Sequence, residues 1–598
     1  MTAIDKKDSK PSKPAVRGIR QTMSDLHIWA GLLVGWILYA MFLTGTVSYF
    51  KEEISQWMRP ELAHQAVVPD AAEVAPRVAQ VLEQVAPGSN QWSLAMPDAR
   101  NNVVSAFWRI AKPEKGERGF GSAVFDPQTG QKVAGRETVG GEFFYRFHFQ
   151  FHYMPVLWAR WLASFCAMFM LVAIVSGVIT HKKIFVDFFT FRWGKGQRSW
   201  LDAHNALSVF GLPFHAMITY TGLVTLMAMT MPWASSAAFK TQAERQAMQS
   251  ELSTFIPAGK PSGEAAPLAP LGDMVRQAQQ RWGEDRIGRV TVNNAGDASA
   301  RVIVTYGDFE RVSISPKYML FEGSTGKLLE VKDQVGAAAE TRGVLYALHL
   351  GRFGDTTVRW LYFLTSLAGT AMVGTGLVMW TVKRRTKLPH PDKPYFGFWL
   401  VERLNIAAIA GLSIGMAAML WANRLLPLGM EKRSDWEIHW FFILWGASLV
   451  WAMLRPAKRA WVELLWAGCA ALALLPVLNV LTTDRPLWRS LIEGDWVFSG
   501  LELTLLALAA LHAWLAVRTW RHQPKRKPQR QAAPRQAPAA RDADTGAVAA
   551  NAVAVNTVAV NTVAVNTVAV NTVAVNTVAA SAVAANAAIA TDLQEARP

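Results

Sequence analysis

The chain has 598 residues, of which 51% are hydrophobic and 18% are charged, and its formal net charge at pH 7 is +16. The apolar residues form blocks long enough to cross hydrocarbon, so the composition predicts a polytopic α-helical membrane protein. The basic residues stand in short runs beside these blocks, as the positive-inside rule requires, and this pattern argues against nucleic-acid binding. Both cysteines, Cys166 and Cys469, fall in apolar blocks, which excludes a disulfide framework, a CxxCH haem-attachment motif and an iron–sulfur site.

The N-terminal segment, residues 1–25, is hydrophilic, and the span after it lacks a small-residue cleavage site, so we expect an uncleaved anchor. Eight apolar blocks have the length that a bilayer requires. They cover residues 26–50, 157–181, 204–230, 357–381, 398–420, 437–454, 461–481 and 498–518. The last four predict a C-terminal four-helix membrane region over 398–518.

The basic runs predict the orientation. If the spans alternate, one side of the membrane receives the runs at 6–20, 181–198, 383–385, 455–459 and 521–527. That side is expected to be the cytoplasm, which places both termini and the loop 182–203 there. The long polar segments 51–156 and 231–350 then face the other side, which in a bacterium is the periplasm of the inner membrane.

The two polar segments and their flanking spans resemble copies of one unit. Each polar segment ends with strand-like alternation and a glycine turn, at Gly130 and Gly326, which predicts an α+β lobe. "SDLHIWAG…LTGTV" aligns with "LDAHNALS…YTGLV", and "ARWLASF…VSGVIT" aligns with "VRWLYFL…GTGLVM". The alignments pair Asp25 with Asp202, His27 with His204, Gly45 with Gly222, Arg160 with Arg359 and Gly177 with Gly376.

After the last span, residues 519–598 turn to Pro, Ala, Arg and Gln and then to a repeated "NTVAV". This composition predicts a disordered cytoplasmic tail, because it lacks the apolar patterning that buries a core.

Two histidines fall within the third span. Ionisable side chains inside a bilayer are costly, which makes His204 and His215 functional candidates. On one continuous helix they would lie within about 20° of the same face and about 16 Å apart along the axis. The structural alternative is that His27 and His204 only bond their neighbours Asp25 and Asp202.

More imidazoles stand where the polar segments return to the membrane. His148 and His152 are four residues apart and could offer one ligand and one spare, and His349 comes from the second copy. Two imidazole layers match the needs of two b-type haems, held by helices that face each other. Bare metal is less favoured, since the spans lack the carboxylates that hard cations prefer. His181, at the cytoplasmic mouth, is a weaker candidate, with snorkelling as its alternative.

The sequence resembles the PepSY-associated transmembrane proteins, which include iron-regulated inner-membrane proteins and FoxB-like ferric-siderophore reductases. The resemblance covers roughly residues 20–385. It is carried by "LHIWAGLLVGW…TGTVSYF", "FHYMPVLWARWLASF…SGVITHKKIF", "RSWLDAHNALSVFGLPFHAMITYTGLV", "LHLGRFGDTTVRWLY…GTGLVMW" and the "DPQTGQ" and "GSTGK" turns. It implies a di-haem protein with axial ligands among His27, His204, His215, His152 and His349.

The expected function is reduction of a ferric siderophore or other ferric chelate bound between the lobes. Electrons would come from the cytoplasmic side or from membrane quinol, through an inner haem near His27 and His204 and an outer one near His215. Neither NAD nor FAD has an evident site, because no GxGxxG follows a strand, so the donor is a separate molecule. Three alternatives stay open: a haem-free PepSY sensor or peptidase regulator, a chelate transporter, and a quinol-linked cytochrome that serves a periplasmic protein.

Overall fold

The computed structural model describes residues 18–62, 69–110, 119–181, 183–190, 192, 194–307, 311–391 and 393–523. The described residues up to His522 form one compact unit, and the description below concerns that unit alone. The low-complexity tail beyond Gln523 lies outside the described residues, so its predicted disorder stays a prediction.

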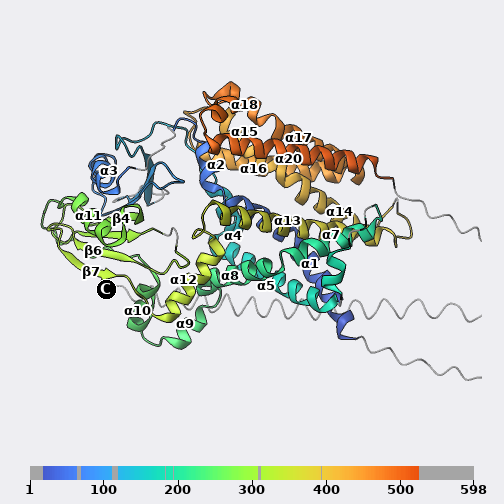
Figure 1. Ribbon diagram of the computed structural model, residues 1–598, viewed down its shortest axis with the longest axis horizontal. Helices are drawn as coiled ribbons and strands as arrows, with labels where there is room; N and C mark the ends of the chain where they lie inside the picture. Colours follow the sequence, from blue (N-terminus) through green and yellow to red (C-terminus); the bar gives the residue numbers. More distant parts are fainter. Residues whose placement is uncertain are drawn as a thin grey trace, which may run out of the picture. The chain divides into compact units, whose positions relative to one another are not determined.

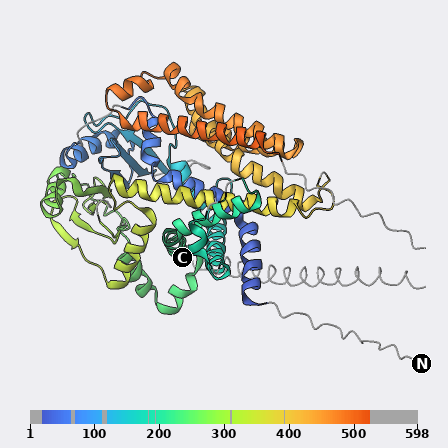
Figure 2. The same cartoon turned by 45° about the vertical axis from the view of Figure 1, so that its right-hand side comes forward.

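Eight helical segments of the described chain are long and apolar enough to cross a membrane, which confirms the predicted spans. The first four belong to the two copies, and the other four form the C-terminal region, in gold to orange-red in Figures 1 and 2. The first four are α1 (Ile19–Ser48), α5 (Val156–Thr180), α8 (Leu212–Thr230) and α13 (Thr356–Arg385). The fifth span consists of α14 (Phe396–Ile406), the π-helical η2 (Ala407–Gly411) and α15 (Leu412–Leu425), and the sixth is α16 (Arg433–Leu454). The seventh consists of α17 (Ala457–Ala473) and α18 (Leu475–Thr482). The eighth, α20 (Trp496–Arg521), follows the short α19 (Leu487–Ile492).

The third span differs from the expectation of one continuous helix over 204–230. α7 (Gln197–Phe210) ends at Gly211, and α8 begins at Leu212 with Pro213 in its first turn. Proline fits there because its missing N–H would have no partner in the first turn of a helix. A Cβ on Gly211 would lie 2.4 Å from Cε1 of His215, so the break needs a glycine. His204 and His215 therefore stand on two helices, and the expectation that one continuous helix carries both is wrong, although both rings donate to carbonyls of α13.

The four spans of the two copies pack into one bundle. α1 packs against both α5 and α13, α5 packs against α8, and α7 packs against α13. We call the end of this bundle that leads into the polar segments the lobe side, and the end that carries the loop 182–203 the loop side. That loop contains the short helix α6 (Ile184–Phe188).

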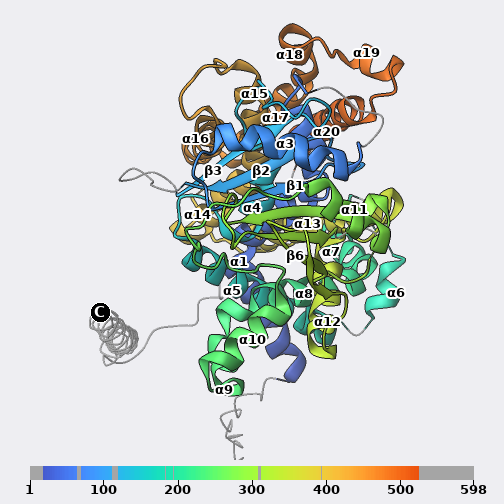
Figure 3. The same ribbon diagram turned by 90° about the vertical axis from the view of Figure 1, so that its left-hand side faces the viewer.

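The two lobes share one sheet, which the sequence did not predict. Its seven antiparallel strands have the order β3-β2-β1-β4-β5-β6-β7, so the first lobe joins the second through β1 and β4 (Figure 3). Ser93 pairs with Thr291 at the centre of this joint, and their hydroxyl oxygens are 2.9 Å apart. The strands are β1 (Gln91–Ala95), β2 (Val104–Arg109), β3 (Phe120–Phe125), β4 (Ile287–Asn293), β5 (Arg301–Tyr306), β6 (Tyr318–Glu322) and β7 (Leu328–Lys332).

Each lobe contributes one amphipathic helix to a common core. α3 (Ala71–Val85) and α11 (Leu271–Trp282) pack against each other, and their apolar faces join the buried side chains of β1, β4 and β5. Asp70 caps α3 by accepting a hydrogen bond from the backbone N–H of Ala72, as side-chain oxygens at helix starts do. The duplication thus produces two similar halves of a single folded body.

Short helices connect this body to the bundle (Figure 1). α4 (Glu142–Gln150) leads from the first lobe into α5, and α12 (Ala337–Leu350) leads from the second lobe into α13. The remaining connectors are α2 (Lys51–Trp57), α9 (Pro232–Ala238), α10 (Gln242–Leu252) and the 3₁₀ turn η1 (Glu284–Arg286). α4 and α12 matter most for the site, because each brings a histidine to the lobe side of the bundle.

Candidate functional site: two facing histidine pairs

The first histidine pair lies towards the loop side. His27 of α1 and His204 of α7 have ring centroids 6.2 Å apart with an interplanar angle of 69°. Nδ1 of His27 lies 2.8 Å from the carbonyl oxygen of Ala173, and Nδ1 of His204 lies 2.9 Å from that of Met372. A carbonyl only accepts, so both Nδ1 atoms carry the proton, and each neutral ring keeps a lone pair on Nε2. We call this the inner pair.

The second pair lies at the lobe side. His148 of α4 and His349 of α12 have ring centroids 6.3 Å apart with an interplanar angle of 30°. Their Nδ1 atoms donate to the carbonyl oxygens of Met41, at 2.5 Å, and Ile218, at 3.0 Å. Burial lowers the pKa of both imidazoles, and for His349, where the neighbouring His148 lowers it further, the pKa falls to about 3. These rings, the outer pair, are therefore neutral with a free lone pair on Nε2.

One local motif holds all four rings. In each case the accepting carbonyl belongs to the residue four positions before a glycine, and that glycine faces the imidazole. A Cβ there would lie 2.7 to 3.2 Å from Cε1 of the ring, which is too close for most real contacts. Because the glycine has no side chain, the carbonyl four positions before it can accept a second hydrogen bond, and the imidazole can approach the helix backbone. The motif pairs Gly45 with His148, Gly222 with His349, Gly177 with His27 and Gly376 with His204.

The motif explains glycines that the sequence marked only as repeat equivalents. Gly45 and Gly222 serve the outer pair, and Gly177 and Gly376 serve the inner pair, so each layer takes one histidine and one glycine from each copy. The signal was present in the alignment, but only the fold shows which ring each glycine faces. On α1, Met41 stands 14 residues after His27, which separates the layers by about 21 Å along that helix.

His215 does not face another histidine in the described structure. It is 1% exposed, and its Nε2 donates to the carbonyl oxygen of Thr365 at 3.2 Å. Its ring contacts Phe42 edge-on, at 6.3 Å between centroids. Its Nδ1 is buried and has no hydrogen-bond partner among the described residues. In His215 the proton is therefore on Nε2, whereas in the four paired rings it is on Nδ1.

The other candidate histidines take other places. His152 stacks on Phe442, with centroids 5.7 Å apart, and lies edge-on to Phe143. His181 ends α5, where its backbone N–H bonds the carbonyl of Gly177. The structure also differs from the alternative in which His27 and His204 bond the neighbouring aspartates. Nδ1 of each ring donates to a backbone carbonyl instead. Asp202 binds Arg192 at 2.7 Å, and Asp25 accepts from Gln21. His148 and His152 are four residues apart in the sequence, and of the two it is His148 whose ring faces that of His349.

A cavity of about 1350 Å³ opens over the outer pair. His148 and His349 line it, together with residues at the start of β4. Basic side chains of both copies line it as well, among them Arg100, Arg160 and Arg359. Glu53 neutralises two of them, since it lies 2.8 Å from Arg100 and 3.0 Å from Arg359.

Arg160 lies differently from its repeat equivalent Arg359. It donates to the side-chain oxygen of Gln150, and its buried Nε has no hydrogen-bond partner among the described residues. The cavity is therefore lined by a pair of imidazoles and by both cationic and carboxylate side chains, among the latter Asp98 and Asp355. In the described residues no group of three or more His, Cys, Asp or Glu is placed to hold a metal ion.

The family comparison agrees with the extent of the duplicated unit. The model of the PepSY-associated TM region matches residues 24–383, which is more than half of the chain and ends within the last turn of α13. No curated protein matches the chain at a significant level.

Proposed function

The chain belongs to the PepSY-associated transmembrane family, and from this premise we propose that it is a di-haem reductase of ferric chelates in the bacterial inner membrane. One haem would be held by His27 and His204 and the other by His148 and His349. The observation that carries the proposal is the pair of facing imidazoles at each level, with the cavity over the outer one.

The histidine pairs fit the ligands of a haem. An imidazole nitrogen binds a metal at about 2 Å, so two imidazoles that share one metal ion would have ring centroids roughly 6 Å apart. The two measured separations are 6.2 and 6.3 Å. In all four histidines Nδ1 donates to a backbone carbonyl. A metal-binding histidine usually donates its other ring N–H in this way, which fixes the orientation of the ring. When bound, haem supplies a one-electron carrier at each level.

The chain's own residues would orient the haem ligands and bind the chelate. The four glycines and carbonyls fix the rings through Nδ1 and leave Nε2 for the haem. A chelate in the cavity would meet the outer pair, and Arg160 offers a cationic donor to an anionic ligand. One electron reduces Fe³⁺ to Fe²⁺, which hard oxygen ligands hold less tightly, and the electron comes from quinol or a cytoplasmic reductase.

The test uses the purified full chain. A reduced-minus-oxidised spectrum and a haem count are expected to give two b-type haems per chain. Dithionite-reduced protein should be reoxidised anaerobically by ferric hydroxamate, catecholate or citrate chelates, and Fe²⁺ should appear in a trapping assay. His148→Ala protein should lose this reoxidation, and His152→Ala protein should keep it.

Two outcomes would overturn the proposal in favour of the alternatives. A colourless protein that takes up no haem would favour a PepSY sensor or peptidase regulator. A haem-containing protein that stays reduced with every chelate would favour a quinol-linked cytochrome.

A further inference from the structure

The C-terminal helices bind the segment that leads into α4. The hydroxyl of Thr138 donates to the carboxylate of Glu437, and Arg433 donates to the backbone carbonyl of Glu137 at 3.0 Å. Arg433 and Glu437 are both fully buried and form an ion pair within α16. Buried charges need partners, and this pair finds them both on the first copy and on Asn423 of α15, which donates to Glu437 and accepts from Arg433 through its carbonyl.

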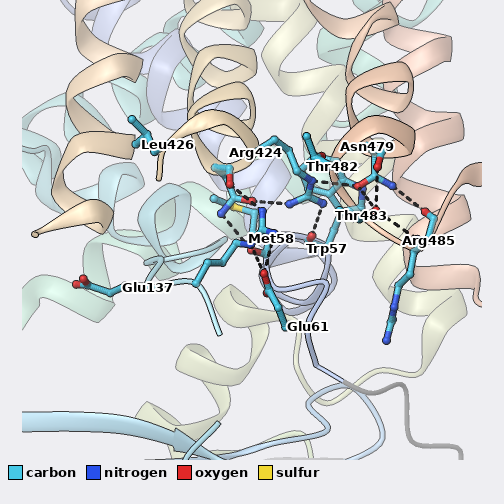
Figure 4. Close-up of polar contacts among 12 residues, drawn as sticks. Trp57, Met58, Glu61, Glu137, Arg424, Leu426, Asn479, Thr482, Thr483 and Arg485 are labelled. Carbon is cyan, nitrogen blue, oxygen red and sulfur yellow. Dashed lines mark hydrogen bonds and ion pairs between the residues drawn. The ribbon is translucent and has the colours of Figure 1, made fainter. Parts of the chain in front are cut away.

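The same region also holds α2, the first connector after α1 (Figure 4). Arg424 of α15 donates to the carbonyl of Trp57 at 2.6 Å, and its guanidinium lies 3.7 Å from the centroid of the indole ring. The neighbouring Asn423 donates to the carbonyl of Met58 at 3.1 Å. The C-terminal helices are thus joined to the first copy by buried, charge-assisted hydrogen bonds, which are the strong kind.

Aromatic packing continues this contact along α4. Phe143 and Phe147 lie edge-on to Phe441 of α16, at 5.1 and 5.6 Å between centroids. Phe147 also lies edge-on to Trp445, one turn further along α16. These side chains belong to one buried cluster that also includes Ala40 of α1, so α16 helps to set the rotation of α4 together with α1.

The exit of α4 is bound by α16 as well. Phe151 and Tyr153 have φ values of 47° and 55°, which are unfavourable for bulky residues and persist only where surrounding contacts enforce them. Here His152 stacks on Phe442, and the Tyr153 hydroxyl contacts Nδ1 of His439. Both ends of α4, and the face between them, are therefore fixed by α16.

The opposite imidazole of the outer pair has a different support. α12 packs on α8, where Tyr346 donates to the carbonyl of Thr225 at 2.6 Å and His349 donates to that of Ile218. The inner pair stands on α1 and α7. A disturbance of the contacts between α16 and α4 should consequently move one ring of the outer pair.

We propose that the C-terminal helices position His148, with Thr138 and Glu437 as positioning residues that act through α4. This inference rests on the proposed function, in which His148 is a ligand of the outer haem. Ligand orientation and its surrounding hydrogen bonds tune a haem's potential, so the C-terminal region would set the potential of the centre that meets the chelate.

The test compares Thr138→Val with Thr138→Ser in the full chain. The valine removes the hydroxyl that bonds Glu437, and the serine keeps it. The matched control is Ser448→Ala, which removes a buried hydroxyl of α16 that bonds the Leu444 carbonyl of its own helix. Tyr153→Phe provides a second variant at the other end of α4, for the case that Thr138→Val does not fold.

The readouts are a redox titration and the low-temperature electron paramagnetic resonance spectrum, with His148→Ala protein used to identify the inner signal. Thr138→Val and Tyr153→Phe are expected to keep two haems and to shift the outer potential and signal, while the inner ones stay unchanged. Thr138→Ser and Ser448→Ala are expected to match wild type. An outer signal that is the same in all four variants overturns the inference.

Hydrogen exchange separates this failure from failure of the proposed function. Amides of residues 141–150 should exchange faster in Thr138→Val than in Ser448→Ala, whether or not haem is bound. Equal exchange rates would overturn the positioning role by themselves. A wild-type protein without haem would overturn the function, and the exchange rates would still decide whether α16 holds α4.

Discussion

Gly45 of α1 lies against the imidazole of His148, so that a Cβ at this position would come within 2.7 Å of both Cε1 and Nδ1 of the ring. Gly222, its repeat equivalent, lies against His349 in the same way. In each copy, a glycine of a span thus lies against a histidine of a connecting helix outside the spans. The two imidazoles of the outer pair are therefore held by equivalent contacts.

Gly45→Ala is expected to lose about half of the bound haem, because the added methyl group displaces His148 from its carbonyl acceptor. Gly31→Ala is the control, since a Cβ at Gly31 of the same helix meets no atom within 4 Å. A haem count by the pyridine method and reduced spectra of both proteins would check this. Equal haem contents in the two variants would contradict the role of the motif.

The paired histidines should divide into two groups by spectrum. His27→Ala and His204→Ala should lose the same haem signal, and His148→Ala and His349→Ala should lose the other. His215→Ala should keep both haems, since its ring faces no second histidine in the described structure. If His215→Ala removes a complete haem signal instead, the assignment of the outer ligands is wrong.

Asp202 should stabilise the loop beside the inner pair in a pH-dependent way. The hydrogen bond from Arg192 is the largest of the effects that hold the pKa of this carboxyl below its usual range. The stabilisation is present above the carboxyl's pKa in the unfolded chain and is lost as pH falls through its lower pKa in the folded protein. Thermal unfolding should show a lower midpoint for Asp202→Asn than for wild type at pH 7 and a smaller difference near pH 3. Asp25→Asn, at the repeat-equivalent position, is the control, and a difference independent of pH would argue against an ionic contribution.

Leu94→Ala should destabilise both lobes by about 2–5 kcal/mol, as expected for a leucine removed from a packed core. Leu94 is fully buried, and it pairs with Val290 across the joint between the lobes. Limited proteolysis of the full chain should show faster cleavage in both polar segments. Phe107→Ala, at a half-exposed position on β2, should have little effect, and faster cleavage in the first segment alone would show that the lobes unfold separately.

The orientation can be tested with reporter fusions. A reporter fused after Lys387 should show cytoplasmic activity, because the basic residues Lys383, Arg384 and Arg385 end α13. A reporter inserted at Gly130 or Gly326, in the turns of the lobes, should show periplasmic activity. The reverse result at Lys387 would place the cavity over the outer pair on the cytoplasmic side.

The sequence by itself determined the eight spans, the duplication and the fact that histidines of both copies gather at two levels. Apolar blocks of bilayer length and equivalent residues in two copies are local signals, and they do not depend on how the helices pack. The break at Gly211 also has a local cause, the glycine and proline at 211 and 213, although the apolar character of the block concealed it.

Only the tertiary structure decided that His148 rather than His152 meets His349, and that the two lobes share one sheet. His148 stands in the last turn of α4, whereas His152 lies beyond the end of that helix, after Phe151 with a φ of 47°, and stacks on Phe442 of α16. The choice therefore depends on where α4 ends and on contacts with a distant helix. The shared sheet likewise depends on the pairing of β1 with β4, whose residues are about 200 positions apart. Local periodicity predicts each element and its apolar face, but the partner of that face comes from distant parts of the chain.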